Sequence, residues 1–356
     1  MSAVTPPKRL VVFAPNWLGD AIMALPLIRD LRRAWPSTSI AVAARPTVAP
    51  LFALVPAVNE TIVLDAGAAW PSLWRTSANV QHLVAGSFDA ALLLPNSFHS
   101  AALAWRAGVR ERWGFATDLR GWMLTTRMRR VRKYGHQVEY YQALAVALDV
   151  PVGDPYAGVV VPDAAIANAT ALLNGRGVTP ERQFVVMAPG AAYGRAKQWL
   201  PERFAELAAA LDAENVATVL VGSNADRAAC QEIGRRSNAI DLAGDTDLAT
   251  LAGVLSLARH VVANDSGAMH LAAAVGARVT AIFGPTNDRK TAPLRASASA
   301  PRPVIVSAEV WCRPCMLREC PIDHRCMTRV SARHVRDAMR SHEGHQGHEG
   351  QNASVS

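Results

Sequence analysis

The segment from Arg259 to Pro285 constrains the fold most, because it encodes two strands, a turn and a helix in one unbroken run. Residues 260–264 have the apolar pattern of a buried strand, residues 265–268 are small turn formers, and residues 269–275 are helix formers that end at Gly276. Residues 278–283 give the second strand. This order predicts a parallel βαβ unit whose turn exposes backbone N–H groups at a helix N-terminus, where phosphate and other anions are favoured.

Strands and helices alternate in the same way on both sides of a looser middle section. Strands are expected at 8–14, 39–43, 61–64, 89–94, 184–188 and 217–222, and helices at 20–35, 201–211 and 247–257. This alternation predicts an α/β protein with two Rossmann-like domains and parallel sheets. We expect a first domain at 1–165, a linker at 166–182, a second domain at 183–340, and a disordered polar tail at 341–356.

The chain has a formal net charge of +8, which favours anionic partners. The positive charges are most closely spaced from Arg127 to Lys133. A basic face of this kind attracts polyanions or an anionic membrane surface, or it is simply solvated. No apolar stretch is long enough to span a bilayer, and polar residues interrupt the apolar segment near the N-terminus. We therefore expect a cytoplasmic chain.

Two loops that follow strands carry residues suited to catalysis. Asn16, Gly19 and Asp20 follow the first strand, where α/β sheets present their ligands, and Asp20 is either a general base or a helix N-cap. The loop from Pro189 to Trp199 combines glycines with Arg195 and Lys197, which favours a diphosphate site, although a solvated surface loop has the same composition.

Four segments in this order resemble the ADP-heptose:lipopolysaccharide heptosyltransferases, which form glycosyltransferase family 9, and most of all the heptosyltransferases II. The matching segments are NWLGDAIMALPLIRDLRRAWP, MAPGAAYGRAKQWLPERFAELA, DLAGDTDLATLAGVLSLARHVVANDSGAMHLAAAVG and IFGPTNDRKTAPL. The likeness extends from Leu10 to about Met339.

The resemblance implies a GT-B fold, in which two Rossmann-like domains face each other across a cleft. It also implies an inverting transfer of L-glycero-D-manno-heptose from ADP-heptose to the first heptose of the lipopolysaccharide inner core. The expected partners are the ADP-heptose donor and a lipid A–Kdo–heptose acceptor at the inner face of the cytoplasmic membrane. No nucleic acid, cofactor or catalytic metal is expected, and the chain is expected to be a monomer.

The resemblance also implies roles for individual residues. Asp20 matches the base, Lys197 matches the lysine that contacts the donor phosphates, and Asp265 matches the acidic residue at the donor sugar. The other expected donor-binding residues are Ala192, Tyr193, Ser223, Thr246, Leu248, Ser266, Gly267, Ala268 and His270. The expected acceptor-binding residues are Asn16, Gly19, Arg127, Arg129 and Arg130.

Two alternatives to this function stay open. The chain could be a heptosyltransferase I or III that acts on a different core acceptor, or a non-enzymatic module that binds a nucleotide or polyanion. The role of four clustered cysteines is also undecided. They are either ligands of a structural metal or free thiols, and they are Cys312, Cys315, Cys320 and Cys326.

Overall fold

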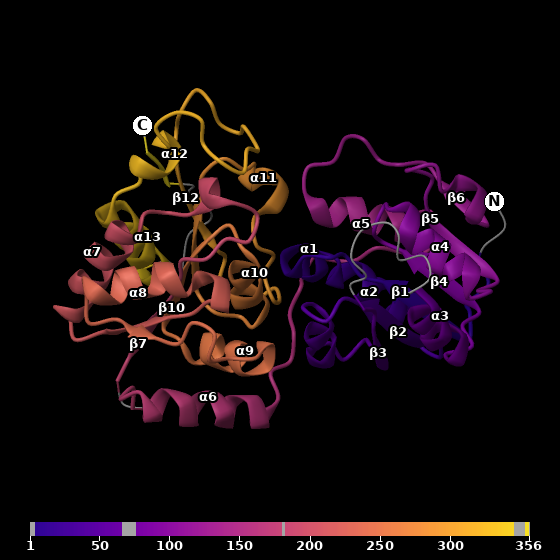
Figure 1. Ribbon diagram of the computed structural model, residues 1–356, viewed down its shortest axis with the longest axis horizontal. Helices are drawn as coiled ribbons and strands as arrows, with labels where there is room; N and C mark the ends of the chain where they lie inside the picture. Colours follow the sequence, from indigo (N-terminus) through magenta and orange to yellow (C-terminus); the bar gives the residue numbers. More distant parts are fainter. Residues whose placement is uncertain (1–3, 66–75, 180–181, 345–352, 356) are drawn as a thin grey trace. The chain divides into compact units, whose positions relative to one another are not determined.

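The computed structural model describes residues 4–65, 76–179, 182–344 and 353–355. They divide into two compact units, Met1–Ala157 and Gly158–Ser356, and each unit has its own parallel sheet with helices packed against it (Figure 1). The expected fold class of two Rossmann-like domains is confirmed. Within the described ranges, we find no helix with the length and apolar character required to cross a bilayer.

The sheet of the first unit has the strand order β3-β2-β1-β4-β5-β6. Its strands are β1 Arg9–Phe13, β2 Ser39–Ala44, β3 Glu60–Val63, β4 Ala90–Leu93, β5 Glu111–Phe115 and β6 Thr126–Met128. The helices are α1 Leu18–Met23, α2 Leu25–Ala34, α3 Thr76–Ala85, α4 Phe98–Arg106 and α5 Gln137–Val146, with 3-10 turns η1 Ala49–Leu54 and η2 Gly121–Met123. Because every pairing is parallel, all six strands have their carboxyl ends at one edge.

Helices cover both faces of this first sheet, which explains why β4 is buried throughout. On one face, Trp113 of β5 contacts Trp35 at 6.0 Å between ring centroids, and Phe115 contacts Tyr140 of α5 at 4.8 Å. On the other face, Phe13 and Leu93 belong to a core cluster with residues of α3 and α4. The sheet therefore presents functional groups only at its edges.

The helix expected over 20–35 is two helices, because a break occurs at Ala24 between α1 and α2. Pro26 lies in the first turn of α2 and has no backbone N–H to donate to the carbonyl of Ile22, so one continuous helix would leave that carbonyl without its partner. The break separates the short helix that carries Asp20 from the longer α2.

The sheet of the second unit has the strand order β13-β12-β11-β10-β7-β8-β9. Its strands are β7 Phe184–Ala188, β8 Ala217–Leu220, β9 Ile240–Asp241, β10 His260–Asn264, β11 Val279–Phe283, β12 Val304–Ala308 and β13 Ala353–Val355. The helices are α6 Asp163–Gly175, α7 Pro201–Asp212, α8 Arg227–Arg235, α9 Leu248–Leu257, α10 Gly267–Ala274, α11 Asp288–Thr291, α12 Arg325–Thr328 and α13 Ala332–Gly344, with 3-10 turns η3 Arg195–Lys197 and η4 Asn224–Asp226.

One core cluster of the second unit joins the strands to α7, α8 and α13 on the same face. Trp199 is its largest buried side chain, packed on Phe204 at 4.8 Å between ring centroids, and its indole N–H donates to the carbonyl of Val330 at 2.9 Å. A buried indole needs such an acceptor. Trp199 thereby fixes the chain two residues after Lys197.

The expected linker at 166–182 is wrong, because most of that range is helix. Helix α6 contacts α9 within the second unit, and Figure 1 shows the two helices side by side. Buried Ala165, Ala169 and Leu173 lie on α6, so burial of apolar area holds it to the second unit. The division of the chain accordingly falls between Ala157 and Gly158, before the expected boundary at 165.

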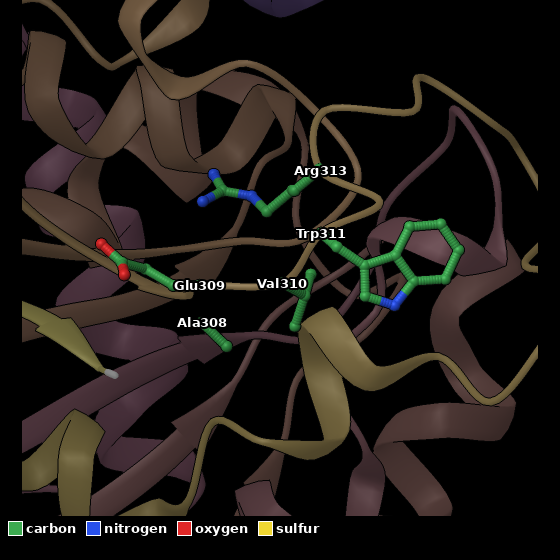
Figure 2. Close-up of a pocket in the computed structure, with 5 residues that line it drawn as sticks. All are labelled: Ala308, Glu309, Val310, Trp311 and Arg313. Carbon is green, nitrogen blue, oxygen red and sulfur yellow. The ribbon is translucent and has the colours of Figure 1, made fainter.

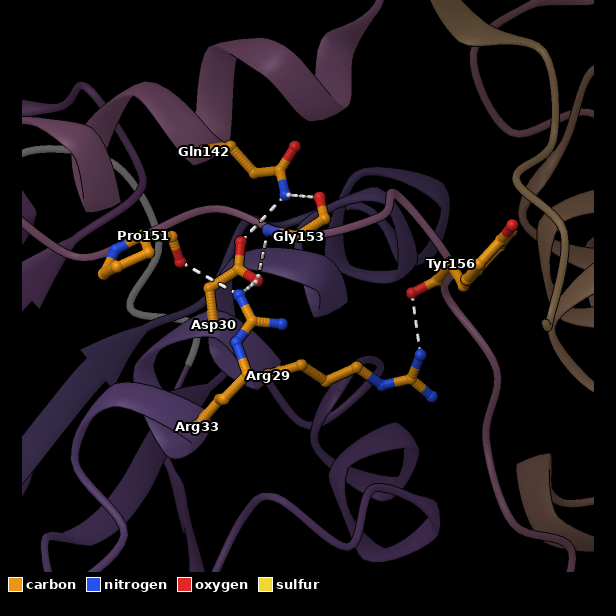
Figure 3. A network of polar contacts seen from close by, with 7 residues as sticks. All are labelled: Arg29, Asp30, Arg33, Gln142, Pro151, Gly153 and Tyr156. Carbon is orange, nitrogen blue, oxygen red and sulfur yellow. Dashed lines mark hydrogen bonds and ion pairs between the residues drawn. The ribbon is translucent and has the colours of Figure 1, made fainter. Parts of the chain in front are cut away.

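A polar network fixes the end of the first unit to its helices (Figure 3). The Asp30 carboxylate, 1% exposed, accepts hydrogen bonds from the side-chain amide of Gln142 at 2.8 Å and from the backbone N–H of Gly153 at 3.0 Å, and it pairs with Arg33 at 2.9 Å. Arg29 donates to the carbonyl of Tyr156 at 2.8 Å. The segment 151–156 is thus bound to α2 and α5 before the chain enters the second unit.

A disordered tail was expected at 341–356, but the structure places residues 341–344 in a helix and residues 353–355 in a strand. Residues 345–352 and 356 lie outside the described residues. Residues 341–344 continue α13, and β13 pairs in parallel with β12. β12 is otherwise an edge strand with unpaired backbone groups, which a short β-forming segment can satisfy.

Candidate functional site

The carboxyl edge of the second sheet gathers most of the expected donor-binding residues. The strands β10, β7, β8 and β9 are neighbours in this order. The loops after them carry, in the same order, Asp265, Lys197, Ser223 and Thr246. Residues far apart in the chain are thus set side by side along one edge, where open α/β sheets bind their ligands.

A charged pair occupies this edge. The Lys197 ammonium lies 2.7 Å from an Asp265 carboxylate oxygen, and the two side chains are 14% and 5% exposed. The same carboxylate oxygen accepts a hydrogen bond from the Thr286 hydroxyl at 2.6 Å. Lys197 also lies over the Tyr193 ring, 4.9 Å from its centroid. Lys197, Asp265 and Tyr193, which were each expected to bind the donor, thus lie together in the structure.

Buried Asn264 holds the two halves of the charged pair together. Its side-chain oxygen accepts from the backbone N–H of Trp199 at 3.0 Å, and its amide nitrogen donates to the carbonyl of Pro189 at 2.7 Å. Asn264 precedes Asp265, while Pro189 and Trp199 bound the loop that carries Lys197. One amide therefore fixes both ends of this loop beside Asp265.

The segment that contains the cysteines supports the Lys197 loop from outside. The backbone N–H of Ala196 donates to the carbonyl of Arg318 at 2.9 Å, and the His324 ring lies 2.8 Å from the Ala196 carbonyl oxygen. The Tyr193 hydroxyl donates to the carbonyl of Met316 at 2.9 Å. A Cβ at Gly194 would meet the Arg318 carbonyl at 2.4 Å, so only glycine permits this approach.

The N-terminus of α10 adds positive potential next to Asp265. Ser266 is the N-cap and accepts from the backbone N–H of Met269 at 3.5 Å, while Gly267 and Ala268 are already helical. The expected turn is therefore shorter than 265–268, because the serine cap begins the helix. His270 lies in the first turns of α10, and its side chain is 3% exposed.

The loop after β8 contacts the loop after β7 through Asp226. Ser223 donates its hydroxyl to the Asp226 carboxylate at 2.7 Å, and a Cβ at Gly190 would lie 2.4 Å from that carboxylate. Farther along the edge, Thr246 and Leu248 flank Asp247, which caps α9 by accepting from the backbone N–H of Thr250 at 2.7 Å. This hydrogen bond lowers the pKa of Asp247.

In the first unit, Asp20 lies in the first turn of α1 and is not its N-cap, which is Trp17. A carboxylate in a first turn interacts favourably with the helix dipole without capping it. The Tyr141 hydroxyl donates to Asp20 at 3.4 Å. Burial, followed by the charge of Asp20, raises the pKa of Tyr141 well above its usual range. The phenol therefore stays protonated and orients the carboxylate.

Aromatic and basic side chains surround this carboxylate. The ring of Tyr140 contacts those of Tyr134 and Tyr141 at 5.3 and 5.8 Å, and the Arg130 guanidinium lies 5.9 Å from the Tyr140 centroid. Burial and the neighbouring Tyr140 raise the pKa of Tyr134, which Asp20 raises further. Arg127, Arg129 and Arg130 are all exposed, and Arg130 is the one that contacts the Tyr140 ring beside Tyr141, the partner of Asp20.

Asn16 is exposed in the turn that leads into α1, and Gly19 is half-buried in the first turn of that helix. Both lie after the carboxyl end of β1, as expected. Asn96 follows β4 at the same edge, and its side-chain amide donates to the Tyr140 hydroxyl at 2.6 Å. The reasoning that selected Asp20, a polar residue after a buried strand, applies equally to Asn96, which the sequence analysis did not select.

Two further residues were missed at the donor edge. Thr286 bonds Asp265, and Arg313 holds the loop that carries Thr286 by donating to the Gly284 carbonyl at 2.6 Å and to Asp288 at 2.8 Å. Thr286 lies in the quoted segment IFGPTNDRKTAPL, which marked the loop but assigned no role to its residues. For Arg313, a single arginine in an irregular loop offers no pattern to detect.

The four clustered cysteines carry free thiols. Burial first, and then the three neighbouring cysteines, raise the pKa of Cys326 to about 11. Over the ranges that the structure describes, no three or more His, Cys, Asp or Glu side chains are arranged to hold a metal ion. Cys326 is buried on α12, whereas Cys315 is exposed in the preceding loop.

A pocket of about 380 Å³ opens at the carboxyl end of β12 (Figure 2). Ala308, Glu309, Val310, Trp311 and Arg313 line it. Figure 2 shows the Arg313 guanidinium and the Glu309 carboxylate on one side, with the Trp311 indole turned the other way. Neither Lys197 nor Asp265 lines this pocket, so it is separate from the charged pair.

Comparisons with known proteins point to one family. Residues 77–325 match the family described as Glycosyltransferase family 9 (heptosyltransferase). The chain is 32% identical to lipooligosaccharide heptosyltransferase 2 of Haemophilus influenzae, over 82% of this chain and 87% of that protein. It is 31% identical to lipopolysaccharide heptosyltransferase 2 of Escherichia coli, over 80% and 85%. The solved structure of E. coli ADP-heptose lps heptosyltransferase II matches with a TM-score of 0.79 and 27% identity, over 94% of this chain and 98% of that chain.

Proposed function

Because this chain belongs to glycosyltransferase family 9, the heptosyltransferase family, we propose that it transfers L-glycero-D-manno-heptose from ADP-heptose to the first heptose of the lipopolysaccharide inner core. An acceptor hydroxyl attacks the anomeric carbon, and its oxygen forms the new glycosidic bond. The bond from that carbon to the β-phosphate oxygen breaks, ADP leaves, and the hydroxyl proton passes to a carboxylate. A single displacement inverts the anomeric configuration.

The order of the loops at the second sheet supports an orientation for the donor. Adenine, ribose, diphosphate and heptose follow one another along ADP-heptose. The loops after β9, β8, β7 and β10 follow one another along the edge and carry Thr246, Ser223, Lys197 and Asp265. A donor laid along this edge meets Thr246 and Leu248 with its base, the Ser223 loop with its ribose, Lys197 with its diphosphate, and Asp265 with its sugar.

Ala192 and Tyr193 belong to the diphosphate part of this arrangement, together with the backbone of Ser266, Gly267 and Ala268. Lys197 and the α10 N-terminus supply the positive potential that a departing diphosphate requires. We propose that they do so without a divalent metal. His270, buried in α10 one turn after Ser266, is the remaining residue that we propose for the donor site.

On the acceptor side, Asp20 is the proposed base and Tyr141 its positioning residue. Asn16, Gly19 and the arginines 127, 129 and 130 are proposed to contact the acceptor, because a phosphorylated sugar chain needs cationic partners. We propose a lipid A–Kdo–heptose acceptor at the inner face of the cytoplasmic membrane, and a monomeric enzyme. Groups of both units then act in one turnover.

The Lys197–Asp265 pair at 2.7 Å is the observation that carries this proposal, because it joins a cation and an anion at the edge where a sugar nucleotide would bind. The direct test incubates the protein with ADP-heptose and defined truncated lipopolysaccharide acceptors and weighs the product by mass spectrometry. Product on an acceptor that already carries one heptose supports the proposal. Product only on heptose-free acceptors, or only on longer cores, would assign the chain to type I or III instead.

Asp20→Ala and Asp20→Asn separate an enzyme from a binding module. Removing a general base costs about 10²- to 10⁴-fold in rate. We expect such a loss of transfer in both variants, with ADP affinity by calorimetry close to that of the wild type. Unchanged transfer in Asp20→Asn would refute the assignment of the base, and ADP binding without any transfer by the wild-type protein would favour the binding module.

A further inference from the structure

The first unit carries a group of large apolar side chains that are not covered. Phe98 and Trp105 lie seven residues apart on α4, and Trp122 of η2 contacts their rings at 6.5 and 5.4 Å between centroids. These three side chains are 37%, 47% and 58% exposed, and Leu119 in the preceding loop is 90% exposed. We call Phe98, Trp105, Leu119 and Trp122 the apolar patch. A contiguous aromatic patch of this kind marks an interaction surface.

Leu119 is exposed on a loop whose backbone conformation is energetically unfavourable. Asp118 and Leu119 both have positive φ, 50° and 54°, a conformation that residues with a side chain rarely adopt. The Asp118 carboxylate accepts from the backbone N–H of Phe98 at 2.6 Å, which ties the loop to the start of α4. The fold therefore imposes the exposure of Leu119.

Arg120 fixes the base of the same loop from inside. It is fully buried and donates to the carbonyl of Phe115 at 3.0 Å, to the Ser100 hydroxyl at 3.1 Å, and to the carbonyl of Pro95. Burial lowers its pKa to about 10, which still leaves it charged at neutral pH. A buried arginine bonded to three separate segments makes the loop a rigid support for the apolar patch.

Positive charge surrounds the apolar patch. Residues 96–133 contain nine Lys and Arg and two Asp and Glu, a net charge of +7 against +8 for the whole chain. Arg106 follows Trp105, and Arg110 is exposed shortly after α4. Arg127 pairs in register with Gly114, and Gly114 with Leu93, so Arg127 lies on the sheet face that α4 covers. The apolar patch thus has a basic margin.

We propose that the apolar patch docks the first unit onto an anionic lipid bilayer, with Leu119 and Trp122 entering the interfacial region. Tryptophan favours that region, and each arginine near an anionic surface adds to binding. A second copy of the chain is a poorer occupant, because it would bring two surfaces of like charge together. The proposal rests on the proposed function, in which the acceptor is anchored in a membrane.

The position of the apolar patch relative to Asp20 fits this use. Phe98 follows Asn96 by two residues, and Asn96 bonds Tyr140, whose ring contacts Tyr141, the partner of Asp20. A bilayer held at the apolar patch therefore presents the sugars of a lipid-anchored acceptor at the carboxyl edge of the first sheet.

The test is sedimentation of the full chain with vesicles, using phosphatidylcholine alone or mixed with phosphatidylglycerol. Leu119→Gly removes the side chain and suits the positive φ, so it does not threaten folding. Trp122→Ala is the second variant. Trp311→Ala is the matched control, because Trp311 is 78% exposed on the second unit.

We expect wild-type protein and Trp311→Ala to bind mixed vesicles about tenfold more strongly than neutral ones, and high salt to weaken that binding. Leu119→Gly and Trp122→Ala should each bind mixed vesicles about tenfold more weakly than wild type. Binding of both variants at wild-type strength overturns the proposal. So does a wild-type dimer, seen by sedimentation velocity, that both variants convert to monomer, since the patch would then bind a second copy.

Transfer assays distinguish failure of this proposal from failure of the proposed function. Both variants should keep wild-type transfer to a water-soluble core oligosaccharide and lose about tenfold on acceptor embedded in vesicles. Equal loss on both acceptors overturns docking as the role of the patch. If the wild-type chain transfers to neither acceptor while its vesicle binding still depends on Leu119 and Trp122, the proposed function fails and the docking surface stands.

Discussion

The Lys197 ammonium has a partner before any donor arrives, because Asp265 lies 2.7 Å away. In the proposed function, an incoming diphosphate would share that ammonium with a carboxylate that also accepts from Thr286. The arrangement keeps a mostly buried cation paired in the free protein, where an unpaired charge would be costly. Under the proposed function, the pair would also orient the ammonium for the leaving group in advance.

Lys197→Ala should lower the rate of transfer about 10²- to 10³-fold, because the group that stabilises the leaving diphosphate is lost. Steady-state kinetics with saturating donor measures the effect on kcat. Arg195→Ala is the matched control, since Arg195 is an exposed cation of the same loop and should change the rate little. Equal losses in the two variants would mean that only the summed charge of the loop matters.

The buried thiol of Cys230 should make the folding stability of the protein fall with rising pH in the alkaline range. Burial, followed by Asp241 and Asp226, raises its pKa from 9.0 to about 12. Between these values the unfolded chain loses the thiol proton while the folded chain keeps it, so folding stability falls as pH rises. Below pH 9 this contribution is fully present.

Compared with Cys230→Ala, the wild-type protein should lose about 1.4 kcal/mol more stability per pH unit above pH 9. Urea unfolding at several values between pH 8 and 10.5 measures the two slopes. Cys315→Ala, at an exposed cysteine, should retain the wild-type slope. Parallel slopes for the wild type and Cys230→Ala would contradict the assignment.

At the scale of elements, buried polar side chains fix how helices meet loops. The Asp30 carboxylate joins α2 to α5 and to the segment that follows α5. A Cβ at Gly153 would lie 2.5 Å from the Arg33 guanidinium, so a larger residue there would displace the Arg33 side chain. The network depends on one buried carboxylate, so its removal affects three elements together.

Asp30→Ala should lower the free energy of unfolding by about 2 to 4 kcal/mol, because buried donors lose their acceptor. Glu60→Ala is the comparison, since Glu60 forms only a half-exposed pair with Arg9 at 3.2 Å and should cost less than about 1 kcal/mol. Chemical denaturation of both variants provides the measurement. A cost for Asp30→Ala no greater than that for Glu60→Ala would show that the network contributes little.

Elements with a continuous apolar run could be predicted from the chain, and short or mixed ones could not. β7 and β10 were predicted with the bounds that the structure shows, because parallel central strands are apolar on both faces. β5, with the sequence ERWGF, and the edge strand β6, with TRM, were not predicted, since both are short and partly polar. The break before α2 was missed because the apolar periodicity continues across it.

At the scale of the whole molecule, the two units carry different parts of the proposed chemistry. The net charge of +7 over residues 96–133 belongs to the first unit, and the buried Lys197–Asp265 pair belongs to the second. The first unit suits a polyanionic acceptor, and the second suits a single diphosphate.

Transfer should proceed in the presence of EDTA at a rate within about twofold of the untreated enzyme, because lysine and a helix N-terminus stabilise the leaving group. The assay uses ADP-heptose and a truncated acceptor, with magnesium added back after chelation. Loss of transfer in EDTA that magnesium restores would contradict the proposed metal-independent mechanism.

The local sequence determined the α/β class and the positions of the central strands, because apolar runs and turn residues act over neighbours in the chain. It also made Asp20 and Lys197 candidates for the site, and the resemblance to the family added Asp265. Only the tertiary structure decided that Lys197 and Thr286 both contact the Asp265 carboxylate, that Tyr141 bonds Asp20, and that His270 is buried. Those contacts join residues separated by 21 to 121 positions, and sheet order and helix packing set them.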